Sequence, residues 1–256
     1  QTFQQISQRY INQNVHAYEP FSGGYLGIGK ITDAFLKEEI NNLIFKIDGL
    51  NHLLPGTPIA FVDKLKQNGN LISAQLDNVL SAAIILYLYQ HGFAGTAFFT
   101  AQEEAGKSWR FVHEWFKKNK ISTDKLVVLD TSPYETREEA DKQLVVLRNK
   151  DVNAKFKSPL LKELKQFCKK NKISFSCKDK FIIEKNKLRE KEGLKPISIG
   201  STELGRIVME SNGQIQGATL QIPTTGYHTV DETACVESIK AIIFILSSFY
   251  IKTVNI

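Results

Sequence analysis

The stretch TAFFTAQEEAGKSWRFVHEWFKKN, residues 96–119, decides the fold class. An apolar run of strand length comes first, Glu103 and Glu104 follow it, and apolar residues at helical spacing complete the stretch. The next stretch, KLVVLDTS (125–132), is a second apolar run, and it ends in the acid Asp130. A strand, a helix and a strand in this order predict a βαβ unit, whose two strands are parallel.

The same alternation continues on both sides of this unit. LISAQL predicts a strand over 71–76, and VLSAAIILYLYQHG predicts a buried helix over 79–92. Further predicted elements are strands over 143–150 and 217–226, with a lysine-rich helix between them, and a last helix over 231–250. We therefore expect an α/β fold with three layers, α/β/α, around a mostly parallel central sheet.

The N-terminal part of the chain is less regular. NLIFKID (42–48) and TPIAFVD (57–63) predict two short strands, and the loop between them contains glycine and proline. A chain of 256 residues is long enough for one large hydrophobic core. We expect a single domain over residues 1–256.

Composition excludes several classes of function. Thirteen lysines lie between Lys155 and Lys195, but no pattern of stacking aromatics or arginine forks accompanies them, which favours a solvated helix face over a nucleic-acid surface. No apolar run reaches the roughly 18 residues that span a membrane. Cys168, Cys177 and Cys235 form no CxxC pair, which fits a reducing compartment and predicts a cytoplasmic protein.

Five polar side chains follow predicted strands: Asp77, Glu103, Glu104, Asp130 and His228. Ligands bind at the carboxyl ends of the strands in open α/β sheets, so these side chains are candidates for one site. Carboxylate oxygens and imidazole nitrogens are zinc ligands, and a carboxylate that stays free can take a proton during hydrolysis. The set therefore predicts a metal centre for a hydrolytic reaction.

Each of these residues also has an ordinary structural interpretation. Asp77 suits the N-cap of the following helix, and Glu103 and Glu104 suit the first turn of a helix, where the dipole favours acids. Asp130 suits the start of a turn, and His228 suits an exposed turn. The combination of all five at strand ends favours the metal centre.

The order of four sequence blocks is more specific than any single one. LDN (76–78), TAQEEAG (100–106), VVLDTS (127–132) and IPTTGYHTVDE (222–232) follow one another along the chain. Together they resemble the zinc aminopeptidases, and above all the glutamyl-aminopeptidase/endoglucanase-like family, over residues 57–245. The resemblance implies an α/β/α fold that carries a co-catalytic site for two zinc ions.

The resemblance also implies a role for each candidate residue. Asp77 would bridge the two metals, and Glu103 would be the general base. Glu104 and His228 would ligate one metal, and Asp130 would ligate the other.

The sequence departs from the family pattern before the first block. Phe61 stands where the family has a ligand histidine, two residues before Asp63, which matches the supporting carboxylate next to the catalytic site. The second metal would keep only Asp77 and Asp130, so we expect one firm zinc and a weak or absent second ion, with Mn²⁺ or Co²⁺ as alternatives. Asp63 and Asp77 lie 14 positions apart, which leaves no room for the family's inserted dimerisation domain. We therefore expect no large cage-like assembly, although a smaller oligomer stays open.

These observations predict a metal-dependent aminopeptidase that removes N-terminal residues from peptide substrates. Thr202 and Glu203 replace the family's Thr-Asp pair, and we expect them on the substrate side of the site. Two alternatives stay open. One is an inactive pseudo-peptidase that serves as a binding module, which Phe61 favours and the retained pair Glu103 and Glu104 opposes. The other is a single-zinc enzyme similar to glutaminyl cyclases.

Overall fold

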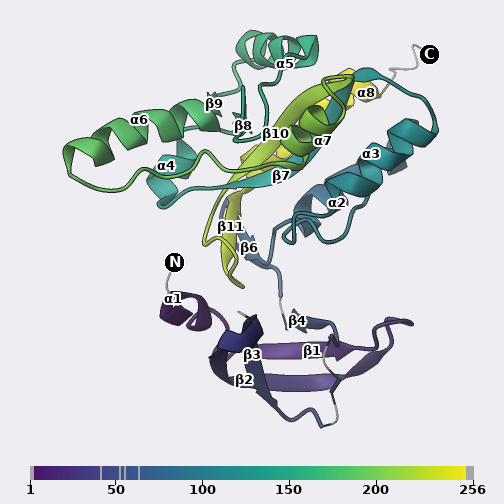
Figure 1. Cartoon of the computed structure of the whole chain (residues 1–256). Coiled ribbons are helices and arrows are strands. Elements are labelled where there is room, and N and C mark those ends of the chain that lie inside the picture. Colours follow the sequence, from purple (N-terminus) through teal and green to yellow (C-terminus); the bar gives the residue numbers. More distant parts are fainter. Residues whose placement is uncertain (1–2, 41, 52, 55, 63, 252–256) are drawn as a thin grey trace.

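The computed structural model describes residues 3–40, 42–51, 53–54, 56–62 and 64–251, and it contains two separate β-sheets (Figure 1). The first sheet has four antiparallel strands in the order β3-β2-β1-β4. Its elements are α1 (Phe3–Ser7), β1 (Asn14–Tyr18), β2 (Tyr25–Lys37), the 3₁₀ turn η1 (Glu38–Ile40), β3 (Asn42–Asp48) and β4 (Ile59–Phe61). The two strands predicted over 42–48 and 57–63 are therefore confirmed as β3 and β4, with β4 shorter than expected.

The second sheet has seven strands and carries the rest of the fold. Its path is β5-β6-β11-β10-β8-β9, and β7 pairs with β10 outside this path. The strands are β5 (Lys66–Asn68), β6 (Leu71–Ala74), β7 (Thr123–Pro133), β8 (Val145–Leu147), β9 (Phe175–Cys177), β10 (Ile215–Thr225) and β11 (Glu232–Cys235). The pairs β7–β10 and β8–β9 are parallel and the others antiparallel, so the sheet is partly parallel.

Helices flank the second sheet. They are α2 (Val79–Gln90), α3 (Trp109–Lys118), α4 (Arg137–Asp141), α5 (Pro159–Lys170), α6 (Lys178–Lys191), α7 (Glu203–Glu210) and α8 (Val236–Tyr250). In Figure 1, α7 lies in front of β10 and α8 behind it. Strand β10 is buried along almost its whole length, as a strand covered on both faces must be, and Leu220 and Ile222 pack in one cluster with Ile242 and Ile245 of α8. The predicted α/β fold is confirmed.

The segment 96–102, predicted as a strand, is not one. It makes no ladder with any described strand, and β7 pairs with β10 alone among the described residues. Packing holds the segment instead, because the Phe98 ring lies 5.1 Å from the Trp115 ring and 5.9 Å from the Phe116 ring, centroid to centroid. An apolar run of strand length indicates that a segment is buried, and this segment is partly buried by packing on α3 without pairing to a strand.

The lysine-rich helix is confirmed as α5. Leu160, Leu161 and Leu164 are buried, while Lys162 and Lys169 are exposed, which gives the helix one apolar and one solvated face. No helix in the described part of the chain combines the length and the apolar character that crossing a bilayer requires. The prediction of a single domain over residues 1–256 did not anticipate the separate first sheet, and the division into domains stays a prediction.

Candidate metal centre

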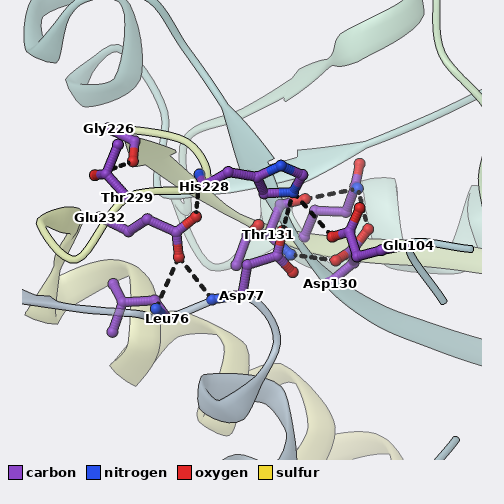
Figure 2. Close-up of polar contacts among 10 residues, drawn as sticks. Leu76, Asp77, Glu104, Asp130, Thr131, Gly226, His228, Thr229 and Glu232 are labelled. Carbon is purple, nitrogen blue, oxygen red and sulfur yellow. Dashed lines mark hydrogen bonds and ion pairs between the residues drawn. The ribbon is translucent and has the colours of Figure 1, made fainter. Parts of the chain in front are cut away.

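Three side chains from distant parts of the chain meet beyond the ends of the second sheet (Figure 2). Asp77 lies between β6 and α2, Glu104 precedes α3, and His228 lies in the turn between β10 and β11. The His228 Nε2 atom is 2.9 Å from Glu104 Oε1 and 3.7 Å from Asp77 Oδ2. One ligand atom from each residue lies within 4.8 Å of the other two, so the structure brings these three predicted ligands together.

The spacing of these atoms fits a divalent cation. Tetrahedral ligands at about 2.1 Å from a zinc ion lie about 3.4 Å from one another, between the 2.9 Å and 3.7 Å found here. Two carboxylates and one imidazole are a donor set that zinc and related ions accept, and they leave a coordination position free. The residues present therefore fit a metal ion.

Asp130 and Glu103, the other two predicted site residues, lie beside this group. Asp130 ends the apolar part of β7, accepts a 2.8 Å hydrogen bond from the Thr131 backbone N–H, and lies close enough to Asp77 for their charges to interact. Glu103 lies next to Glu104 in the loop before α3 and is influenced by the charges of Glu104 and Asp77. The structure thus places all five predicted residues in one neighbourhood.

Crowded carboxylates perturb one another's protonation. Burial and the neighbouring Glu104 raise the pKa of Asp77 to about 6, and burial and Asp77 hold the pKa of Asp130 well above its ordinary value. Burial and Glu104 raise the pKa of Glu103 to about 7. The Glu104–His228 hydrogen bond lowers the pKa of Glu104 and raises that of His228.

These shifts indicate an excess of negative charge. No lysine or arginine among the described residues forms an ion pair with Asp77, Glu103 or Glu104. The Arg148 guanidinium approaches Asp130 only through Gln221, which accepts from Arg148 Nε at 3.0 Å and donates to Asp130 Oδ2 at 3.3 Å. A cluster of crowded acids without a lysine or arginine partner is the environment that a bound cation stabilises.

Sequence reasoning missed Glu232, which is buried beneath the site. Its Oε2 accepts hydrogen bonds from the backbone N–H groups of Leu76 and Asp77, both at 2.8 Å, and its Oε1 accepts from the His228 N–H at 2.6 Å (Figure 2). Its position in the sequence could have indicated a role, because Glu232 lies in a buried strand four positions after the candidate ligand His228. A buried acid needs hydrogen-bond donors nearby.

The two residues expected on the substrate side differ in their surroundings. Thr202 is buried and is the N-cap of α7: its hydroxyl accepts from the Gly205 N–H at 3.1 Å and donates to Asp151 at 2.8 Å. Glu203 is less buried, accepts from the Thr100 hydroxyl at 3.1 Å, and its charge contributes to the raised pKa of Glu103. Of the two side chains, that of Glu203 is therefore the less constrained.

A cavity of about 470 Å³ adjoins the carboxylates. Its lining includes Asp77, Glu103 and Glu203, and also the cationic side chains Arg148 and Lys178. A wider, largely apolar groove of about 890 Å³ runs from the same carboxylates along the edge of β7 that does not face β10. The site is open to molecules larger than water.

Phe61, interpreted from the sequence as the replacement of a ligand histidine, lies outside the candidate metal centre. Phe61 ends β4 of the first sheet, where it pairs with Val15 and its ring stacks on Tyr10 with centroids 5.6 Å apart. It lines neither the cavity nor the groove next to Asp77. Spacing along the chain suggested the position, but β4 belongs to another sheet. Asp63, the predicted supporting carboxylate, lies outside the described residues.

Solved structures with the same fold include several aminopeptidases. The aminopeptidase APDkam598 of Desulfurococcus kamchatkensis is 14% identical with a TM-score of 0.68, and the match covers 95% of this chain and 69% of that one. The TET aminopeptidase of Thaumarchaeota archaeon SCGC AB-539-E09 is 17% identical with a TM-score of 0.67, covering 96% and 72%. Pyrococcus horikoshii TET1 peptidase is 16% identical with a TM-score of 0.63, covering 95% and 73%. At these identities the likeness shows the fold.

No curated protein sequence matches the chain. The model of one protein family does match, that of the M42 glutamyl aminopeptidases, over residues 50–185, which is just over half of the sequence. This match includes Asp77, Glu103, Glu104 and Asp130, and it agrees with the fold of the structural neighbours. The chain belongs to the M42 glutamyl aminopeptidase family.

Proposed function

We propose that this chain is a metal-dependent aminopeptidase that hydrolyses the first peptide bond of peptide substrates. The observation that carries the proposal is the meeting of Asp77, Glu104 and His228 within 4.8 Å, with Glu103 beside them. Family membership and the fold of the aminopeptidase neighbours support it.

Asp77, Glu104 and His228 would hold one firm divalent ion, most suitably zinc, with Mn²⁺ or Co²⁺ as alternatives. When bound, such an ion polarises a carbonyl oxygen and makes a water molecule more acidic. Asp130 accepts hydrogen bonds from Thr131 and Gln221, and it lies where a second, weaker ion would share Asp77.

Glu103 would act as the general base of the reaction. A base works best when its pKa lies near the working pH, and burial and Glu104 raise the pKa of Glu103 to about 7. Its carboxylate is not part of the three-residue group, so it stays free to take a proton from the attacking water and pass it to the leaving amine.

Glu203 would select substrates with a free N-terminus. It lines the cavity together with Glu103, and within the described residues its carboxylate accepts one hydrogen bond, from the Thr100 hydroxyl. A peptide α-ammonium group placed between Glu103 and Glu203 would relieve the repulsion between these two acids. An N-acetylated peptide offers no such cation.

The experiment is an assay of amino-acid anilides with Zn²⁺, Co²⁺ or Mn²⁺, each measured beside the N-acetylated form of the same anilide. We expect hydrolysis that depends on the metal, is abolished by a chelator and is blocked by acetylation. Equal cleavage of both anilides would exclude an aminopeptidase. No cleavage with any of the ions would favour the inactive binding module.

A further inference from the structure

Glu232 lies at a junction between the two chain segments that supply metal-ligand candidates. It is the first residue of β11 and pairs with Ala74 of β6, only three residues before Asp77. Its side chain is 1% exposed, and no lysine or arginine among the described residues pairs with it. A buried carboxylate in this situation needs hydrogen-bond donors to remain charged.

The donors are backbone N–H groups from both segments. One oxygen, Oε2, accepts from Leu76 and Asp77, and the other, Oε1, accepts from His228. The single carboxylate therefore links the backbone that carries Asp77 to the backbone that carries His228. Figure 2 shows it between the two.

The backbone at His228 needs such a link. Its φ is +58°, a left-handed conformation that residues other than glycine adopt at a cost of about 1 kcal/mol or more. The turn around it is tightly closed, because Gly226 has φ +73° and a Cβ at this position would lie 2.8 Å from the Asp231 carbonyl oxygen. Strained backbone persists only where its surroundings hold it, and the bond from the His228 N–H to Glu232 does so.

We infer that Glu232 is a positioning residue for the metal centre: it fixes the distance between the Asp77 and His228 side chains by holding both backbones with one buried carboxylate. It lines neither the cavity nor the groove, and its oxygens accept from backbone N–H groups rather than contacting the candidate metal-binding atoms. The inference rests on the proposed function only in that it assumes a metal binds at this site.

The test compares Glu232→Gln with the wild-type protein. Glutamine has nearly the same shape but offers one acceptor oxygen and one NH₂ group, so it can satisfy either the Leu76 and Asp77 donors or the His228 donor, and its NH₂ then faces an N–H. We expect the zinc dissociation constant, measured by competition with a chelator of known affinity, to rise about 10- to 100-fold.

Asp179→Asn is the matched control. Asp179 is a buried carboxylate that accepts a 2.9 Å hydrogen bond from the Asn149 backbone N–H, but it does not line the cavity. Both variants should melt at a lower temperature, whereas only Glu232→Gln should bind zinc more weakly. If Glu232→Gln retains the wild-type zinc affinity to within twofold, or Asp179→Asn weakens it equally, the inference is overturned.

A second measurement needs no metal. In the metal-free protein, we expect amide hydrogen exchange at Leu76, Asp77 and His228 to accelerate at least tenfold in Glu232→Gln, while exchange in the buried strand β10 changes far less. Should the wild-type protein bind no zinc, this result would still support the positioning role while the proposed function fails. Unchanged exchange at all three amides would overturn it.

Glu232→Asp provides a variant for the case in which the glutamine variant does not fold. It keeps the charge but is one methylene shorter, so its oxygens cannot reach both segments at hydrogen-bond distance. We expect zinc affinity between those of the wild type and Glu232→Gln. Wild-type affinity in Glu232→Asp would show that the link between the two backbones is not what holds the ligands.

Discussion

Replacing Glu103 by glutamine removes the proposed base and keeps the size of the side chain. General-base catalysis contributes typically 10²- to 10⁴-fold, so we expect kcat for an amino-acid anilide to fall by about that factor, with KM nearly unchanged. Because Glu103 is not one of the three grouped ligands, zinc should bind to Glu103→Gln nearly as tightly as to the wild type.

The same substitution has a predictable effect on the stability of the metal-free protein. The pKa of Glu103 is raised to about 7, so the folded state holds its proton more firmly than the unfolded chain, and stability is lost as the pH rises from about 4.5 to 7. In Glu103→Gln this loss of stability with rising pH should be absent, because glutamine does not titrate. Since Glu103 stays partly exposed to solvent, the repulsion is screened, and we expect a gain of about 1 kcal/mol or less at pH 8, or up to about 4 °C in Tm.

The assays are steady-state hydrolysis at saturating zinc, zinc titration and thermal unfolding in chelator at pH 5 and pH 8. Glu114→Gln is the control, since Glu114 is an exposed acid on α3 whose one ion pair within the described residues is with Lys117, at 3.6 Å. Its activity and zinc affinity should equal those of the wild type. Hydrolysis by Glu103→Gln at more than a tenth of the wild-type rate would refute the assignment of Glu103 as the base.

Three further predictions test other parts of the account. Burial lowers the pKa of Lys178 to about 7, so the unfolded chain binds more protons than the folded protein between pH 7 and 10.5. The free energy of unfolding of the wild-type protein should therefore rise with pH across this window. Urea unfolding of Lys178→Met should show a much smaller rise. Thr202→Val removes the N-cap of α7 and the hydrogen bond to Asp151, and it should lower the free energy of unfolding in urea by about 1–2 kcal/mol. Zinc affinity should stay unchanged. A large loss of zinc affinity would contradict the structural role of Thr202. Phe61→His should leave the number of bound zinc ions unchanged in a metal analysis, because Phe61 packs on Tyr10 in the first sheet, and an additional ion would restore it as a ligand position.

Sequence reasoning reached the site residues because their type and their position after apolar runs are both local features. Asp77 follows β6, Asp130 ends the apolar part of β7, and His228 follows β10, and the sheet brings these points together. Their roles as ligands stay predictions. The pattern that revealed them requires no knowledge of which strands pair.

What the sequence could not provide depends on partners distant in the chain. Phe61 was assigned by its position two residues before Asp63, but the register of β4 with β1 places it in another sheet. Phe98 lies in an apolar run that reads as a strand, whereas its packing on α3 holds the segment without a ladder. The hydrogen-bond donors to Glu232 include the backbone N–H groups of Leu76 and Asp77, which lie more than 150 residues away in the sequence. No local sequence pattern predicts these contacts.

Asp77, Glu104 and His228 are proposed to hold one divalent cation. The most direct measurement is an anomalous difference map, recorded at the zinc edge from crystals of the full 256-residue chain grown with zinc. We predict a strong peak about 2.0–2.2 Å from one oxygen of Asp77, one oxygen of Glu104 and Nε2 of His228, with a weaker or absent second peak beside Asp130. A map without a peak at the three side chains, or with its strongest peak elsewhere, would contradict the account.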